Sequence, residues 1–148
     1  AQNDACSPNH FRSAIDRVLQ VREDGRIDVW DGCEAISEKP NYGFAAVIAN
    51  VDDQHGNDLF IANDVGFNHL WMSHAGDDRA SLFTLHESAQ IFGAAAGLLG
   101  QRQGCMGVAS GDFDRDGRLD LHVTNFWNQS SDLYLWKGTG LFENEAAK

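Results

Sequence analysis

The segment Asp112–Asp120 carries four carboxylates at a spacing that suits a cation. The acids stand at its positions one, three, five and nine, with a glycine at position six. Side chains at alternating positions of a tight loop converge, and glycine permits the sharp turn between them. Calcium prefers roughly six to eight hard oxygens, which carboxylates, a backbone carbonyl and water can supply. We therefore predict a calcium site formed by Asp112, Asp114, Asp116, the backbone carbonyl of Arg118, and Asp120.

The residues that follow this segment argue against an EF-hand. An EF-hand loop is followed by a helix and carries a bidentate glutamate at position twelve. Here position twelve is Val123, and residues 121–124 alternate in polarity like a strand. Magnesium is less favoured than calcium, because it needs stricter octahedral geometry and usually keeps several waters. A solvated acidic turn without metal is the alternative, but unneutralised carboxylates this close would repel one another.

A second segment of similar pattern lies 62 residues upstream, at residues 50–63. Asp52 aligns with Asp114, and Asp58 aligns with Asp120. The segment keeps oxygen-bearing side chains but only two of the four charges, and fewer charges mean lower calcium affinity. We predict a weaker second metal site, with a metal-free turn of the same shape as the alternative. Its candidate ligands are Asn50, Asp52, Gln54, Gly56 and Asp58.

A shorter echo of the pattern lies near the N-terminus, at residues 24–29. This segment matches the second half of the acidic pattern. The first and third positions of that pattern would fall on Gln20 and Arg22, so the acidic cage is absent. Two apolar alternating runs, residues 18–21 and 27–30, flank Asp24-Gly25, a pair typical of tight turns. We predict a plain β-hairpin here and no metal.

Two stretches of the chain resemble FG-GAP repeats, also called VCBS repeats. They are residues 108–121, around the acidic segment, and residues 58–64. Such repeats occur in integrin alpha-chain propellers and in many bacterial secreted or surface proteins. Residues 123–126, with Leu133-Tyr134 beyond them, are similar to the bacterial group that resembles cartilage acidic protein. The resemblance covers residues 43 to 144, about two units, and the Asp112 loop is its more specific match.

The resemblance implies an all-β fold of propeller-type blades, each a four-stranded antiparallel sheet with calcium in a loop between neighbouring strands. We expect an N-terminal hairpin region or incomplete blade at 1–42, a first unit at 43–104 and a second at 105–148. Propellers typically have four to eight blades, so two to three blades would make a partial or oligomer-completed propeller. An excerpt of a longer chain and a compact sandwich are the alternatives. Exposed sheet edges favour self-association or a partner chain.

Composition narrows the class of partner and the compartment. The net charge is −11, which disfavours nucleic acid because phosphates require basic neutralisation. No run of eighteen apolar residues occurs, so we expect no membrane span. Cys6 and Cys33 form a candidate disulfide, and the chain starts at Ala1, so we expect a secreted, periplasmic or cell-surface protein. Cys105 is expected to be a buried apolar residue rather than a reactive thiol.

Binding is favoured over catalysis. The chain has no His-Glu-x-x-His pair, Gly-x-Ser-x-Gly elbow, phosphate-binding loop or dinucleotide fingerprint. We expect a calcium-binding module for protein or carbohydrate binding, adhesion or scaffolding. Four of its aromatic residues either form a ligand face or pack between sheets; they are Phe126, Trp71, Trp127 and Trp136. The alternative is a carbohydrate-active enzyme with an acid pair among Asp64, Asp77, Asp78 and Glu87.

Overall fold

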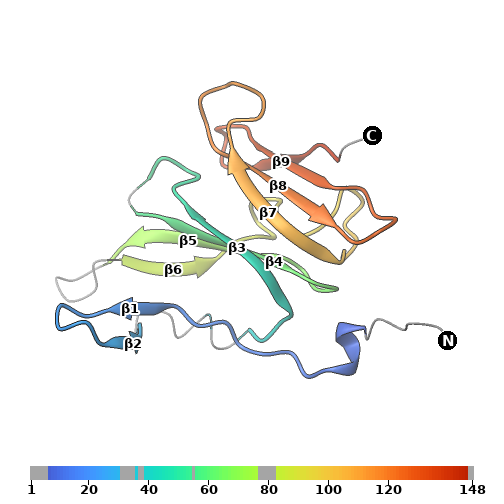
Figure 1. The fold of residues 1–148 in the computed structure, drawn as a ribbon. Coiled ribbons are helices and arrows are strands. Elements are labelled where there is room, and N and C mark those ends of the chain that lie inside the picture. Colours follow the sequence, from blue (N-terminus) through green and yellow to red (C-terminus); the bar gives the residue numbers. More distant parts are fainter. Residues whose placement is uncertain (1–6, 31–35, 37–38, 55, 77–82, 147–148) are drawn as a thin grey trace.

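The computed structural model describes residues 7–30, 36, 39–54, 56–76 and 83–146, which form three antiparallel sheets (Figure 1). A short 3-10 turn, η1 (Pro8–His10), precedes a hairpin of β1 (Leu19–Val21) and β2 (Ile27–Val29). The first larger sheet contains β3 (Gly43–Ala49), β4 (Asp58–Asn63), β5 (His69–Ala75) and β6 (Phe83–Glu87). The second contains β7 (Cys105–Gly111), β8 (Asp120–Asn125), β9 (Asp132–Trp136) and β10 (Phe142–Asn144).

Each larger sheet is a meander in which every strand pairs with the next one along the chain. The expected all-β class and four-stranded antiparallel sheets are therefore confirmed. The predicted hairpin at Asp24-Gly25 is also confirmed, with Leu19 opposite Val29 and Gly25 at a φ of 82°. None of the described residues belongs to a helix with the length and apolar character needed to cross a membrane.

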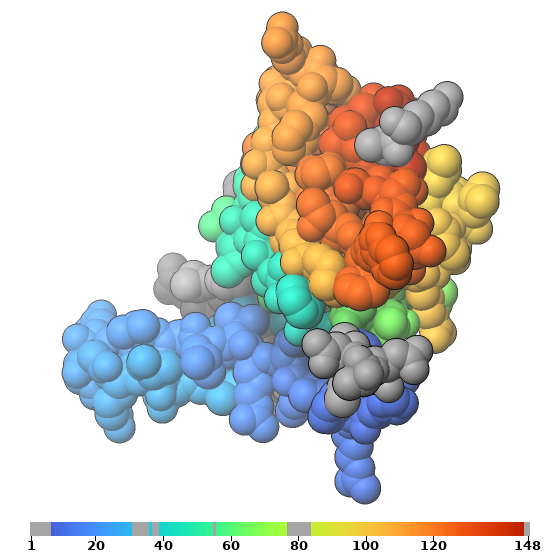
Figure 2. Space-filling model, turned by 45° about the vertical axis from the view of Figure 1, so that its right-hand side comes forward, coloured from blue at the N-terminus to red at the C-terminus, as the bar shows by residue number. Residues whose placement is uncertain are grey.

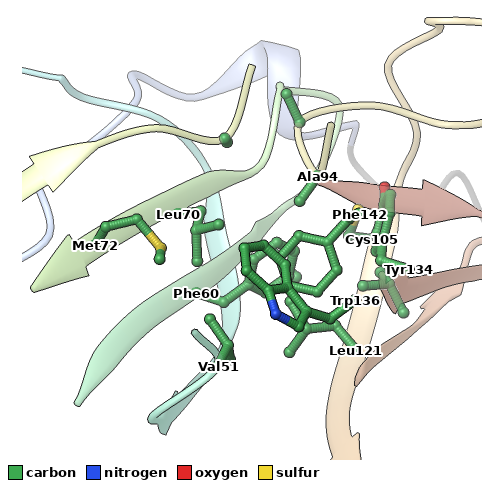
Figure 3. Close-up of a cluster of buried hydrophobic side chains, with 14 residues drawn as sticks. Val51, Phe60, Leu70, Met72, Ala94, Cys105, Leu121, Tyr134, Trp136 and Phe142 are labelled. Carbon is green, nitrogen blue, oxygen red and sulfur yellow. The ribbon is translucent and has the colours of Figure 1, made fainter. Parts of the chain in front are cut away.

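The main core lies between the two larger sheets. One face of the first sheet contributes Phe60 and Leu70, and the facing side of the second contributes Leu121, Tyr134 and Trp136 (Figure 3). All five side chains are buried because strand residues two apart share a face, and these faces meet. This packing holds the β3–β4 and β7–β8 loops on one two-sheet body.

The N-terminal region covers the other face of the first sheet. Trp71 and Ile61 on this face form a second buried cluster with Ile36, and Val18 and Trp30 pack against it. Strands β4 and β5 are thus enclosed on both faces, and most of their residues are buried. The hairpin β1–β2 itself extends away from the body, as the blue segment in Figure 2 shows.

Candidate metal centre

The loop between β7 and β8 brings three of the predicted ligands together. One carboxylate oxygen from each of Asp112, Asp114 and Asp116 lies within 4.8 Å of the other two. All three residues are exposed, and they are the one group of this kind in the described part of the chain. A compact set of three hard, negatively charged oxygens can hold a metal ion.

Backbone N–H groups hold these carboxylates in place. The Asp112 carboxylate accepts hydrogen bonds from the backbone N–H of Asp116 and of Gly117, both at 3.0 Å. Asp114 accepts a second bond from the Asp116 N–H at 3.1 Å. Gly117 has a φ of 89° and Arg115 a φ of 65°, so the chain turns sharply through the left-handed region. The acids therefore converge because of the turn they help to form.

Two cationic side chains lie on the cluster. Lys137, just after β9, places Nζ 3.2 Å from Asp114, and the Arg118 guanidinium lies 3.1 Å from Asp116. The backbone N–H of Arg118, and then its guanidinium, hold the pKa of Asp116 below its ordinary value. The hydrogen bond to Asp114 raises the pKa of Lys137. The loop thus gathers negative charge that attracts cations from its surroundings.

Asp120 has a different position from the other predicted ligands. It is fully buried at the start of β8 and is not a member of the three-residue group. One of its oxygens accepts the backbone N–H of Phe113 at 2.8 Å, and the other accepts that of Trp136 at 2.9 Å. Asp120 therefore ties the acidic loop to β9 through two hydrogen bonds made inside the protein.

The upstream loop contains a matching buried aspartate. Asp58 begins β4, and its carboxylate accepts the backbone N–H of Val51 at 2.9 Å and of Ser73 at 2.8 Å. Burial raises the pKa of Asp58, although both backbone bonds and nearby His74 oppose that shift. Sequence reasoning missed this anchoring role in both loops. The available signal was an aspartate placed directly before a buried apolar strand.

The remaining residues of the Asn50 loop form a turn with fewer acids at the predicted ligand positions than the Asp112 loop has. Asn50 donates its side-chain amide to the carbonyl of Gln54 at 2.8 Å, and the Gln54 N–H donates to Asp52 at 2.9 Å. The side-chain oxygen of Asn50 is buried and has no hydrogen-bond partner among the described residues. Gly56 has a φ of 95° and lies against the Ser73 side chain. Two acids, Asp52 and Asp58, stand at its predicted ligand positions, and Asp58 is already bonded to the backbone.

The cysteine predictions have separate outcomes. Cys6 and Cys33 lie outside the described residues. Cys105 is buried, as expected, and its thiol donates to the Asn68 side-chain oxygen at 3.2 Å. Burial raises the pKa of this thiol to about 12, so it is protonated at neutral pH.

Of the four aromatic residues predicted to form a ligand face or to pack, two are buried and two are exposed. Trp71 and Trp136 are buried and pack in the two clusters. Trp127 is 90% exposed and Phe126 is 55% exposed, both in the loop after β8. These two are available to a ligand, whereas the other two stabilise the fold.

Of the four candidates for a catalytic acid pair, the structure describes two, and these two have different surroundings. Asp77 and Asp78 lie outside the described residues. Glu87 accepts the backbone N–H of Ala89 at 3.0 Å and pairs with Lys39 at 3.2 Å. Burial raises the pKa of Asp64, which lies just after β4.

Comparisons of this chain with protein-family models, curated proteins and solved structures give no match. The resemblance to FG-GAP repeats therefore stays a prediction from the residues that carry it.

Proposed function

We propose that the Asp112 loop binds calcium and that the chain is a calcium-stabilised β-sheet module. The observation that carries this proposal is the convergence of Asp112, Asp114 and Asp116 within 4.8 Å. These carboxylates are hard oxygen donors in an exposed loop, and calcium tolerates more varied ligand geometry than magnesium does. The Arg118 carbonyl and water complete the ligand set in this proposal.

The role of the metal is structural. Calcium offsets two of the three negative charges and fixes the turn between β7 and β8. The ligand set does not exist in an unfolded chain, so the binding free energy adds to the free energy of unfolding. Asp120 also anchors the loop, because its two oxygens accept the backbone N–H groups of Phe113 and Trp136.

The module acts outside the cytoplasm in binding, adhesion or scaffolding. An exposed site with three carboxylates suits the weak calcium affinities of extracellular modules, with dissociation constants of roughly 0.1–1 mM. The exposed side chains of Phe126 and Trp127 offer contact area for a protein or carbohydrate. The net charge of −11 favours such partners over nucleic acid.

Calorimetric titration with calcium tests the proposal. We expect one saturable site in the wild type and its loss in Asp114→Ala. Asp52→Ala is the matched control, because Asp52 holds the equivalent position in the upstream loop, and it should bind as the wild type does. A titration without heat in the wild type, or equal binding by Asp114→Ala, would show that the acidic loop is a turn without a metal.

A further inference from the structure

A polar cavity opens beside the C-terminal end of β4. The Asn50 loop lies at the other end of this strand. Its volume is about 340 Å³. Residues before β3, the β4–β5 loop and the segment leading to β7 line it. Ligand pockets measure roughly 300–1,000 Å³, so this cavity has room for a monosaccharide or an amino acid. The lining residues that matter here are Lys39, Asn41, Phe67, Glu87 and Arg102.

Arg102 presents a preorganised guanidinium to this cavity. Its Cζ lies 4.7 Å from the centroid of the Phe67 ring, and Phe67 itself packs against the main core. A guanidinium stacked on an aromatic face keeps its N–H donors free in its own plane. Among the residues that the structure describes, none forms an ion pair or a hydrogen bond with the Arg102 guanidinium.

The other charged groups of the lining neutralise each other. Lys39 Nζ lies 3.2 Å from the Glu87 carboxylate, whose second oxygen accepts the Ala89 N–H at 3.0 Å. The lining therefore contains two cations and one acid, and Arg102 is the cation with no ionic partner in the described part of the chain. A ligand with one negative charge matches this arrangement. A dianion is less suitable because Glu87 would repel the second charge.

The wall beside Arg102 is held rigidly. Val65 has a φ of 54°, a strained conformation for a β-branched residue, and its N–H donates to the Gln103 carbonyl at 2.9 Å. Asn41 donates to the Phe67 carbonyl at 3.0 Å, and its side chain fills the space where Gly66 would carry a Cβ. The surface under Arg102 thus needs little reorganisation on binding, which favours affinity.

We propose that this cavity binds a small molecule through a carboxylate group, with Arg102 as its principal donor. The planar fork of arginine matches a carboxylate with two parallel hydrogen bonds. This site is separate from the acidic loop, and it does not depend on calcium. The carboxylate can belong to an acidic sugar or to an amino-acid derivative, which offer the same chemistry.

Calorimetry in the presence of chelator tests this proposal with two matched pairs of probes. D-glucuronate is compared with D-glucose, and N-acetylglycine with N-acetylglycinamide, so each pair differs in its carboxylate. We expect at least one acid to bind, and its neutral counterpart to bind roughly tenfold more weakly or worse. The pair that responds identifies the sugar or the amino-acid source.

Variants assign the binding to Arg102. Arg102→Gln should weaken the acid roughly tenfold or more, and Arg102→Lys should lie between it and the wild type. Arg26→Gln removes an equal charge from the exposed hairpin and should bind as the wild type does. Because Arg102 is exposed, thermal melts should show all three variants folded. Equal binding of acid and neutral probes, no binding of either acid, or an equal loss in Arg26→Gln would overturn the proposal.

Discussion

The Asp112 and Asn50 loops have the same supports and different charges. In each loop, a buried aspartate at position nine begins a strand, and it accepts one N–H from position two of its own loop and one from the next strand. In each, the residue at position four has a positive φ, 65° at Arg115 and 58° at Asp53. The three-acid cluster exists in the Asp112 loop, and the Asn50 loop has asparagine and glutamine in place of two acids.

This comparison separates the shape of the loop from its capacity for metal. The buried aspartates hold the turn, because their hydrogen bonds satisfy N–H groups inside the protein. The exposed acids set the charge, and they can change without loss of the turn, as Gln54 shows by bonding to Asp52 at 2.9 Å. Metal affinity and loop stability should therefore respond to different substitutions.

The largest expected effect is the loss of folding stability when a buried aspartate that anchors a loop is replaced. Asp58→Ala leaves two buried N–H groups unpaired, and Asp120→Ala leaves the buried N–H of Trp136 and the part-buried N–H of Phe113 unpaired. At about 1–3 kcal/mol for each group, unfolding should become easier by up to about 6 kcal/mol. Asp58→Ala should lie toward the lower end, since burial already disfavours the Asp58 charge and raises its pKa. Urea unfolding in chelator measures both effects. An unchanged midpoint in either variant would contradict the shared anchoring role.

Removal of calcium should have the next largest effect. A ligand that binds the folded state alone, at a concentration one hundred times its dissociation constant, stabilises it by about 2.7 kcal/mol. We expect chelator to lower the melting temperature of the wild type and of Asp52→Asn. Asp112→Asn should melt at the same temperature with and without calcium. A calcium response that is lost in Asp52→Asn instead would place the metal in the upstream loop.

A gain of charge in the Asn50 loop should add a site. Asn50→Asp with Gln54→Asp restores acids at positions one and five, beside Asp52 at position three. We expect the calcium stoichiometry to rise from one to two, with the new site weaker because Gly56 stands at position seven rather than six. Asn57→Asp is the control, since it adds charge outside those positions. A stoichiometry that stays at one would show that charge alone does not distinguish the loops.

The smallest expected effect concerns the cation beside the Asp112 loop. Lys137 forms an exposed ion pair with Asp114, and such pairs are weak because water and salt screen them. Lys137→Met should therefore strengthen calcium binding by roughly two- to fivefold. Lys39→Met removes the same charge far from the loop and should leave the affinity unchanged. Weaker calcium binding in Lys137→Met would indicate that the lysine supports the site rather than competing with the metal.

Local patterns in the sequence predicted several features correctly. Alternating apolar residues indicated the strands, and Asp24-Gly25 indicated the hairpin, because both depend on residues close together in the chain. The spacing of Asp112, Asp114 and Asp116 likewise predicted their convergence, since a single turn brings them together. These features need no information about distant segments.

Tertiary structure decided the role of Asp120 and the cavity beside Arg102. Spacing along the chain predicts Asp120 as a metal ligand, but it does not predict that the second Asp120 oxygen bonds to Trp136, sixteen residues away on the next strand. Arg102 stacks on Phe67, and Lys39 reaches Glu87 across 48 residues. Such contacts arise from how sheets and loops pack, so the spacing of residues along the chain does not predict them. The sequence by itself determined which residues can turn, pair and carry charge, whereas packing determined which of those charges face the solvent and which hold the fold together.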